Sequence, residues 1–559
     1  MAATEKLRSL VITDTAGKAK ALKKFLGKSY VVISTDGFLK NIPKSRIGID
    51  VENYSPDYIT IRGKGDILKE LKRESLKARK VFFATNLDGA GEFLAQQCCE
   101  IFGVNEKSRC RLVIDEMTKE TVKKSFDNAR AVDENLVAAF QARQIIDKFV
   151  SHRIGEYLDC KIYRGVKVGR FRAMLLNLIS LVTETKTEGD FQFEEKFTPA
   201  VLQEISLGNL NFSSTKTILT LEQLYEGFNF DKAGFAGLIK FPRTEKIELA
   251  SENREPESVK DFLTGSQYKL YELIYKKIHG GEIVNKFYLN ASCTEQSLMA
   301  TFDTLKIDWT DFYSVGINSL LKRGYIELGD GVFKITDLGQ QVLDSVNEFF
   351  GELFSVESYN KLSEQISQVA QGKAEKLSVI KNYLNEFEKC FDSAMKSLGE
   401  NPQPKAQPVI ESDEVCEKCG RPMVIRRGRY GQFLTCSGYP ECKNAKPLLN
   451  YLEQKCPKCG GRLTKRNFKG GRIFYSCENF QTCDFNTWDE PLETVCKFCG
   501  STRFLHRFKD RAPMPYCGNA NCESRKDHPM NKIIEDAQKR YEARKLRKAK
   551  NLNKKVDQE

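Results

Sequence analysis

The sequence predicts a multidomain protein: an N-terminal α/β domain on a parallel sheet, an α+β body, and C-terminal ribbons with four cysteines each. Its 559 residues are enough for three or four domains at about 150 residues each. The first ~150 residues alternate short apolar runs with helical patterns, which is typical of a mostly parallel sheet. Twelve of the 18 cysteines fall in three C-terminal quartets with metal-ligand spacing.

Composition narrows the classes of partner. The net charge is +13 with 29% charged residues, and this basic bias favours a polyanionic partner such as nucleic acid. No run of 18 apolar residues occurs, so we expect no membrane partner. Residues 1–6 lack an apolar signal segment, and the cysteine spacing suits an intracellular zinc protein better than a secreted disulfide protein.

Residues 80–102 are the centre of the predicted α/β domain. The apolar run 81–84 predicts a buried strand, residues 86–91 form a turn with two glycines, and a helix begins near Glu92. Asp88 and Glu92 would then lie at the carboxyl end of a strand, where open α/β sheets place their sites. Two such carboxylates can hold Mg²⁺, although a polar loop followed by a helix-starting glutamate explains the same pattern.

A second acidic residue follows the first predicted strand, at residues 10–12. Asp14 comes next, then a turn of small residues, then Lys18 at the start of a helix. This order favours phosphate binding at the helix N-terminus, although an ordinary capped βα unit would look the same. Asp14 would lie beside Asp88 if the two strands are neighbours in one parallel sheet. We also predict helices over 66–80 and 135–157, a strand over 112–114, and β-like runs over 191–221.

The cysteine quartets predict three structural Zn²⁺ sites. Each begins with a CxxC knuckle that offers two thiolates, and the quartets repeat about every 40 residues. Units this small bury little core, so metal binding would drive their folding; three accidental quartets of free cysteines are the alternative. The quartets are Cys416, Cys419, Cys436 and Cys442; Cys456, Cys459, Cys477 and Cys483; and Cys496, Cys499, Cys517 and Cys522.

Cations alternate with aromatic residues between the knuckles. This pattern suits single-stranded nucleic acid, because charge follows the backbone and rings stack on bases. The alternative is that the aromatic residues pack the small core of each ribbon. The candidate DNA-binding residues of the ribbons are Arg427, Arg429, Tyr430, Phe433, Arg466 and Arg507.

The sequence resembles the type IA DNA topoisomerases over nearly the whole chain. The shared motifs occur in family order at residues 10–12 with 18–20, 43–45, 61–65, 116–120, 141–143, 169–170 and 237–244, and in the cysteine ribbons. The resemblance implies a TOPRIM domain over 1–130 and a topoisomerase IA core over 131–400, with a truncated gate segment and a winged-helix-like unit near 291–350. A linker over 401–415, ribbons over 416–446, 456–488 and 496–525, and a basic tail over 526–559 complete the expected domains.

The acidic cluster departs from the family pattern. The family has a glutamate on the first strand and Asp-x-Asp-x-x-x-Glu after the later one. Here these positions are Asp14, Asn86, Asp88 and Glu92. Since fewer anionic oxygens hold a divalent ion more weakly, the resemblance implies a weakened Mg²⁺ site.

The position of the nucleophile also departs. One shared motif is at residues 237–244. In the family, the residue two positions after its isoleucine, which is Ile239 here, is the tyrosine that attacks a DNA phosphodiester. Here it is Phe241, which has no oxygen that a neighbouring base or metal could activate. The resemblance assigns Arg243 to the scissile phosphate and Lys18 to a phosphate or proton-transfer role, and both residues are retained.

A basic segment precedes the predicted helix near residue 170. It corresponds to a family segment that binds single-stranded DNA, and it carries Lys167, Arg170 and Arg172. Positive charge here suits phosphate contact, although a basic solvated turn is the alternative.

These observations predict a DNA-binding protein of the topoisomerase IA type that lacks strand cleavage. We expect it to bind single-stranded or underwound DNA in the cytoplasm, associated with the nucleoid, with RNA polymerase or an active topoisomerase as a protein partner. One rival is an active type IA topoisomerase, which relaxes negatively supercoiled DNA through a displaced tyrosine. The other is an adaptor whose zinc ribbons bind a protein.

Overall fold

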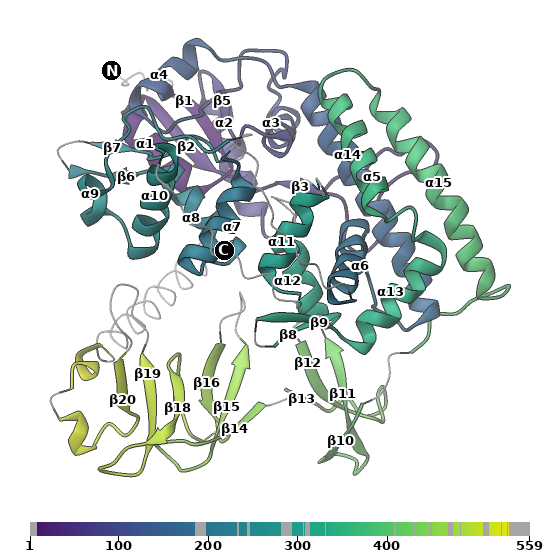
Figure 1. Ribbon diagram of the computed structural model, residues 1–559, viewed down its shortest axis with the longest axis vertical. Coiled ribbons are helices and arrows are strands. Elements are labelled where there is room, and N and C mark those ends of the chain that lie inside the picture. Colours follow the sequence, from purple (N-terminus) through teal and green to yellow (C-terminus); the bar gives the residue numbers. More distant parts are fainter. Residues whose placement is uncertain are drawn as a thin grey trace, which may run out of the picture. The chain divides into compact units, whose positions relative to one another are not determined.

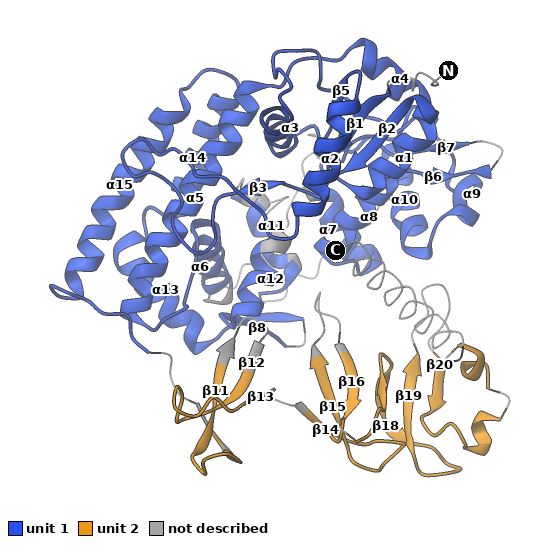
Figure 2. Ribbon diagram, turned by 180° about the vertical axis from the view of Figure 1, so that it is seen from behind, with its two compact units in different colours: residues 1–407 blue, residues 408–559 orange. Residues whose placement is uncertain are grey.

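The computed structural model describes residues 8–184, 197–231, 234–242, 246–280, 293–305, 307, 313–329, 331–406, 410–428, 431–447, 450–467, 473–480, 482–506, 514–526, 528–533 and 535. The chain forms two compact units, Met1–Gln407 and Pro408–Glu559 (Figure 2). Helices predominate in the described part of the first unit, and strands in that of the second (Figure 1).

A three-stranded parallel sheet lies at the N-terminus of the first unit. Its order is β2 (Tyr30–Ser34), β1 (Ser9–Thr13) and β5 (Val81–Ala84). In the central strand, Leu10 pairs with Val31 on one side and with Val81 on the other. The expectation that the strands before Asp14 and Asp88 are parallel neighbours is confirmed, so both turns lie at one edge of the sheet. Helices α1 (Ala16–Leu26) and α3 (Gly89–Phe102) begin at these turns.

Two predictions of strands are wrong. Residues 112–114 form no strand, because Arg111 bridges Phe83 in parallel and then pairs with Arg130 in the antiparallel sense, which ends the ladder. Residues 197–221, expected to alternate as β-like runs, instead belong largely to α7 (Pro199–Leu210) and α8 (Ser214–Glu226). The hydroxyls of the residues before these helices accept backbone N–H groups of the first turns, and such caps favour helix over strand. Residues 191–196 of that prediction lie outside the described residues.

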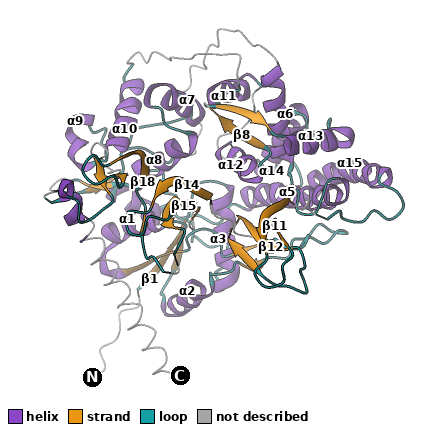
Figure 3. Cartoon of the chain, turned by 90° about the horizontal axis from the view of Figure 1, so that it is seen from below, coloured by secondary structure: helices purple, strands orange, loops and turns teal. Residues whose placement is uncertain are grey.

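A helical body follows the sheet. The predicted long helix is confirmed as α5 (Glu134–Lys161), which packs through Ile146 and Phe149 into the largest hydrophobic core of the unit. Helices of this body lie side by side in Figure 3. The predicted order of two helices and a hairpin near 291–350 is also observed. The elements of the body after α5 are α6 (Arg170–Glu184), α11 (Glu295–Thr304), α12 (Tyr313–Arg323), β8 (Ile326–Gly329), β9 (Val332–Ile335), α13 (Asp337–Phe350), α14 (Val356–Ala370) and α15 (Lys376–Ser397).

Shorter elements complete the first unit. The helix predicted over 66–80 is confirmed as α2 (Gly65–Lys77). The others are β3 (Lys40–Asn41), β4 (Ile59–Thr60), α4 (Lys119–Asp127), β6 (Phe228–Asn229), β7 (Phe235–Ala236), α9 (Pro256–Val259) and α10 (Gly265–Ile278). Among the helices of the described ranges, none has the length and hydropathy to span a bilayer.

The second unit contains three antiparallel sheets, one for each cysteine quartet. They are β10 (Ile410–Val415), β11 (Pro422–Gly428), β12 (Gly431–Cys436) and β13 (Ala445–Pro447); β14 (Asn450–Lys455), β15 (Arg462–Asn467), β16 (Ile473–Cys477) and β17 (Asn486–Thr487); and β18 (Glu490–Val495), β19 (Thr502–His506) and β20 (Met514–Cys517). Strand β10 begins inside the segment expected to be a linker, because it pairs with β11.

The second and third ribbons share one hydrophobic core. Phe504 of the third ribbon packs among Cys456, Leu463 and Cys477 of the second, with its ring centroid 5.6 Å from that of Phe485. The first ribbon has a core of its own around Met423 and Leu434.

Candidate functional site

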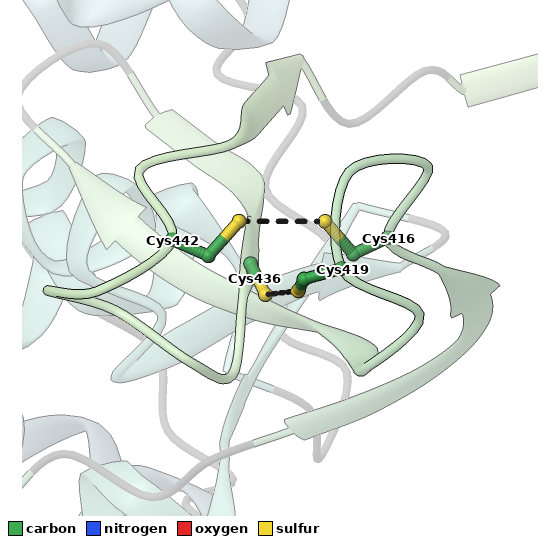
Figure 4. A group of neighbouring side chains, drawn as sticks. All are labelled: Cys416, Cys419, Cys436 and Cys442. Carbon is green, nitrogen blue, oxygen red and sulfur yellow. Dashed lines mark hydrogen bonds between the residues drawn. The ribbon is translucent and has the colours of Figure 1, made fainter.

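Each cysteine quartet converges on one point. In all three, the four sulfur atoms lie within 4.8 Å of one another. In the first ribbon, Figure 4 shows Cys416 facing Cys442 at 3.7 Å between sulfurs, and Cys419 facing Cys436 at 3.2 Å. Four thiolates at about 2.3 Å from a Zn²⁺ ion would lie about 3.8 Å apart in a tetrahedron. The donor set therefore fits zinc in all three ribbons.

Hydrogen bonds to the sulfurs favour the thiolate form, whereas burial opposes it and raises the pKa of some of these thiols, Cys436 among them. The side-chain amide of Asn444 donates to Cys416 Sγ at 3.3 Å and lowers the pKa of that thiol to about 6. The backbone N–H of Gly438 donates to Cys436 Sγ at 3.4 Å, a bond that also stabilises negative charge on sulfur. In each knuckle the second cysteine is followed by a glycine with positive φ, which lets the chain turn back under the metal position. With all four ligands from the protein, such sites are structural.

Only part of the predicted DNA-binding set of the ribbons lies in the described residues. Arg466 stacks over the ring of Phe480, with 4.3 Å between the guanidinium carbon and the ring centroid, and Phe433 is half-buried. The backbone of Arg427 belongs to β11, but its side chain is outside the description, as are Arg429, Tyr430 and Arg507 entirely. The alternation of cations with rings thus persists in the second ribbon, where it includes the exposed ring of Trp488, 5.6 Å from that of Phe474.

At the carboxyl edge of the parallel sheet, Asp14, Lys18 and Asn86 are in direct contact. The Lys18 ammonium donates to both carboxylate oxygens of Asp14, at 3.0 and 3.3 Å, and to the side-chain oxygen of Asn86. The backbone N–H of Asn86 donates to Asp14 Oδ2 at 3.2 Å. Lys18 is only 4% exposed, and burial lowers the pKa of its amine although Asp14 opposes the shift.

The other two predicted Mg²⁺ ligands are engaged elsewhere. Glu92 is 0% exposed and accepts from Arg111 Nε at 2.8 Å, from Arg130 Nη2 at 2.7 Å and from the Asp133 backbone N–H at 3.0 Å. Burial acts to raise the pKa of Glu92, but the two arginines outweigh it and hold the pKa below its usual value. Asp88 is the N-cap of α3 and accepts from the Gly91 N–H at 2.7 Å. The structure therefore brings Asp14 and Asn86 together but turns the Glu92 carboxylate into an ion-pair network.

A cavity of about 350 Å³ opens beside this edge of the sheet. Three carboxylates lie on its wall, which makes it unfavourable for a phosphate that brings no cation. Its lining includes Asp14, Asp36, Phe38, Asn86, Leu94 and Glu222.

A carboxylate also lies at the N-terminus of α1, where the sequence suggested phosphate. The hydroxyl of Thr15 donates to Glu226 Oε1 at 2.6 Å, and burial raises the pKa of Glu226. The same carboxylate lies against Gly17, where a Cβ atom would be 1.7 Å from Glu226 Oε2. This contact joins α1 to the end of α8.

Phe241 lies beside Lys18 but offers it only a ring. Its side chain is 3% exposed, and the Lys18 ammonium is 5.6 Å from the ring centroid. The ring of Tyr225 packs edge-on against Phe241, with 5.4 Å between centroids. The Tyr225 hydroxyl donates to the Ile114 carbonyl at 2.7 Å, and burial raises the pKa of that phenol. Arg243, the other residue predicted for this site, lies outside the described residues.

The three basic residues near α6 have different environments. Lys167 is exposed, and its backbone is held by the Tyr325 hydroxyl, which accepts from the Lys167 N–H at 3.0 Å. Arg172 is half-buried. Arg170 is 3% exposed, pairs with Asp147 at 3.1 Å and faces the ring of Tyr359, so it does not reach solvent as placed. Of the three, Lys167 is the exposed one, whereas Arg170 fixes α6 against its neighbours.

Sequence reasoning missed Arg111, Arg130 and Glu226. Arg111 had a signal, because an arginine inside the apolar run 110–114 must find a buried partner or leave the core. The roles of Arg130 and Glu226 depend on contacts across 38 and 211 residues, which no local pattern reports.

Comparison with known proteins agrees with this geometry. The Toprim domain family matches residues 9–117, which include the parallel sheet. The family described as "Topoisomerase DNA binding C4 zinc finger" matches residues 413–451 and 453–491, the first two ribbons. Full-length topoisomerase I from Thermotoga maritima has a similar fold, with a TM-score of 0.61 and 21% identity over 83% of this chain and 100% of that one. The chain therefore contains a Toprim domain and two zinc ribbons of the topoisomerase type, and its fold is similar to that of this topoisomerase I.

Proposed function

We propose that this chain binds single-stranded or underwound DNA and does not cleave it. The proposal that the chain does not cleave DNA rests on Phe241, a buried ring at the position where the type IA family has its nucleophilic tyrosine. The proposal that the chain binds DNA is supported by the zinc ribbons, which match a DNA-binding family, and by the basic segment next to α6. A protein of this kind would act by occupying DNA, and RNA polymerase or an active topoisomerase is the partner it would influence.

The nearest phenol does not replace the missing one. Tyr225 is in ring contact with Phe241, but its hydroxyl is buried and donates to a backbone carbonyl. Attack on a phosphate needs an accessible phenol near its deprotonated form, and burial shifts Tyr225 away from that form. This argues against the rival in which a displaced tyrosine does the chemistry.

The positive charges around Lys167 and Arg172 support DNA binding independently of Phe241. Burial, and then the charge of Lys167, lower the pKa of Lys148. Burial, and then the charge of Arg323, lower the pKa of Arg172, which Asp147 only partly offsets. A polyanion such as the phosphate backbone of DNA would relieve the repulsion between these cations.

Strand cleavage is tested by trapping. When the zinc-loaded full chain is incubated with supercoiled plasmid and Mg²⁺ and then denatured, we expect no covalent protein–DNA adduct and no change in linking number. The variant Phe241→Tyr restores the phenol, yet we expect little or no relaxation, because Asn86 leaves the acidic cluster one carboxylate short. A 5′-phosphotyrosine adduct from the wild-type chain would establish the displaced-tyrosine rival instead.

DNA binding is tested through its salt dependence. For a single-stranded oligonucleotide, replacing Lys167 with alanine should reduce the slope of log K against log[salt] by about 0.7, the value for one lost phosphate contact. The control is Lys72→Ala, which removes an equally exposed lysine from α2 and should leave the slope unchanged. If the wild-type chain shows no salt-dependent binding at all, the protein-adaptor reading replaces this one.

A further inference from the structure

The type IA family implies a Mg²⁺ ion at the Toprim carboxylates, and the residues of this chain do not fit one. Among the described residues, the groups of three or more acidic, histidine or cysteine side chains that converge closely enough to hold an ion are the three cysteine quartets. The Toprim carboxylates do not form such a group, although the sequence places them at one edge of the sheet. We propose that the ammonium of Lys18 takes the place of the divalent cation, so that this site binds no Mg²⁺.

The geometry of Lys18 is that of a bound cation. Its Nζ atom contacts three oxygens, two from Asp14 and one from Asn86, and these side chains follow neighbouring parallel strands. Oxygen atoms of this kind are the ligands that Mg²⁺ prefers. Lys18 belongs to the first turn of α1 and follows Asp14 by four residues. The helix therefore places the ammonium beside the Asp14 carboxylate.

The charges of Asp14 and Lys18 cancel without a metal. Asp14 carries one negative charge and Lys18 one positive charge, while Asn86 is neutral where the family has a second carboxylate. Of the other two predicted ligands, Glu92 is balanced by Arg111 and Arg130 in the interior, and Asp88 caps α3. A divalent ion would have to displace a buried ammonium from Asp14 and, to add Asp88 as a second anionic ligand, would have to take that carboxylate from the cap of α3, which is a poor exchange.

The steric surroundings hold the ammonium in place. The rings of Tyr225 and Phe241 lie 5.7 and 5.6 Å from Lys18 Nζ, measured to their centroids. Aromatic faces and edges at this distance stabilise a cation and leave the lysine no route to solvent on that side. Phenylalanine at position 241, where the family has tyrosine, therefore places an apolar ring beside the ammonium.

The experiment measures metal binding without DNA, so its result is independent of the proposed function. Mn²⁺ is titrated into the zinc-loaded full chain, and free Mn²⁺ is followed by electron paramagnetic resonance. The wild-type chain should show no saturable binding at the sheet edge. Asn86→Asp restores a carboxylate, and the double variant Lys18→Met/Asn86→Asp also removes the ammonium; the double variant should bind Mn²⁺ at least about tenfold more tightly than the wild type.

The control for the lysine change is Lys20→Met, on the same helix but exposed, which should bind like the wild type. Adding Asp14→Asn to the double variant should abolish the new site, which assigns it to this edge. Wild-type binding that Asp14→Asn removes would overturn the proposal, because the ion would then coexist with the ammonium. A double variant that keeps its wild-type unfolding temperature and binds no better than the wild type would overturn it too, since Lys18 would not be what excludes the ion.

Discussion

Replacing Arg111 with methionine should destabilise the first unit by about 3–5 kcal/mol, because it leaves a buried carboxylate without its main partner. Arg111 and Glu92 are both fully buried, and the guanidinium also donates to the carbonyls of Phe83, Asn86 and Leu112. Calorimetry of the full chain should show the transition of this unit of about 400 residues lowered by about 4–6 °C, while the ribbon unit is unaffected.

The control for this change is Arg73→Met, which breaks a surface pair with Glu74 and should cost less than about 1 kcal/mol. Acid provides a second check. The pKa of Glu92 is depressed in the folded state, so its stabilising effect is present above the pKa of an unfolded glutamate, about 4.3, and is lost as the pH falls through the lower folded value. The difference between wild type and Arg111→Met should therefore shrink below about pH 4. Equal shifts for Arg111→Met and Arg73→Met would contradict the role given to the buried pair.

Removing zinc should unfold the second unit while the first stays folded. Zinc binding to small four-ligand sites is worth about 10–16 kcal/mol, which exceeds what such small cores supply alone. Hydrogen exchange followed by mass spectrometry should show that a chelator deprotects residues 410–533, whereas residues 8–184 keep their protection. The metal content before chelation should be three zinc ions for each chain.

Single ligand changes should separate the ribbons. Cys436→Ser should deprotect the first ribbon alone, since its core is separate. Cys477→Ser should deprotect the second ribbon and also weaken the third, because both share the core around Phe504. Cys390→Ser removes a half-buried cysteine outside the quartets and should leave three zinc ions bound. If Cys477→Ser deprotected fewer amides than Cys436→Ser, that result would contradict the shared core of the second and third ribbons.

The parts of this fold that follow local patterns could be predicted from the sequence. Strands β1 and β5, the helices after them and the three cysteine quartets all depend on residues close together in the chain. The residues around 197–221 were wrongly predicted as strands, because an apolar pattern without helical spacing also fits a helix that is buried on all sides, as the consecutive buried positions 201–206 of α7 show.

The candidate site was harder to predict because its chemistry depends on pairing across the fold. The sequence predicted Asp14, Asp88 and Glu92 as the ligands of one Mg²⁺ site, with the neutral Asn86 at a fourth position. It could not show that Glu92 points into the interior, since Arg111 and Arg130 belong to segments 19 and 38 residues away. Nor could spacing reveal that a lysine four residues after Asp14 would fold back onto it rather than toward solvent.

The contact between Glu226 and Gly17 has a consequence for how the first unit can vary. Even the methyl group of alanine at position 17 would overlap the Glu226 carboxylate, which would have to rotate away and give up its hydrogen bond with Thr15. Glycine at this position thus preserves a side-chain link between the first helix of the sheet domain and the end of α8, and any larger residue would sever that link.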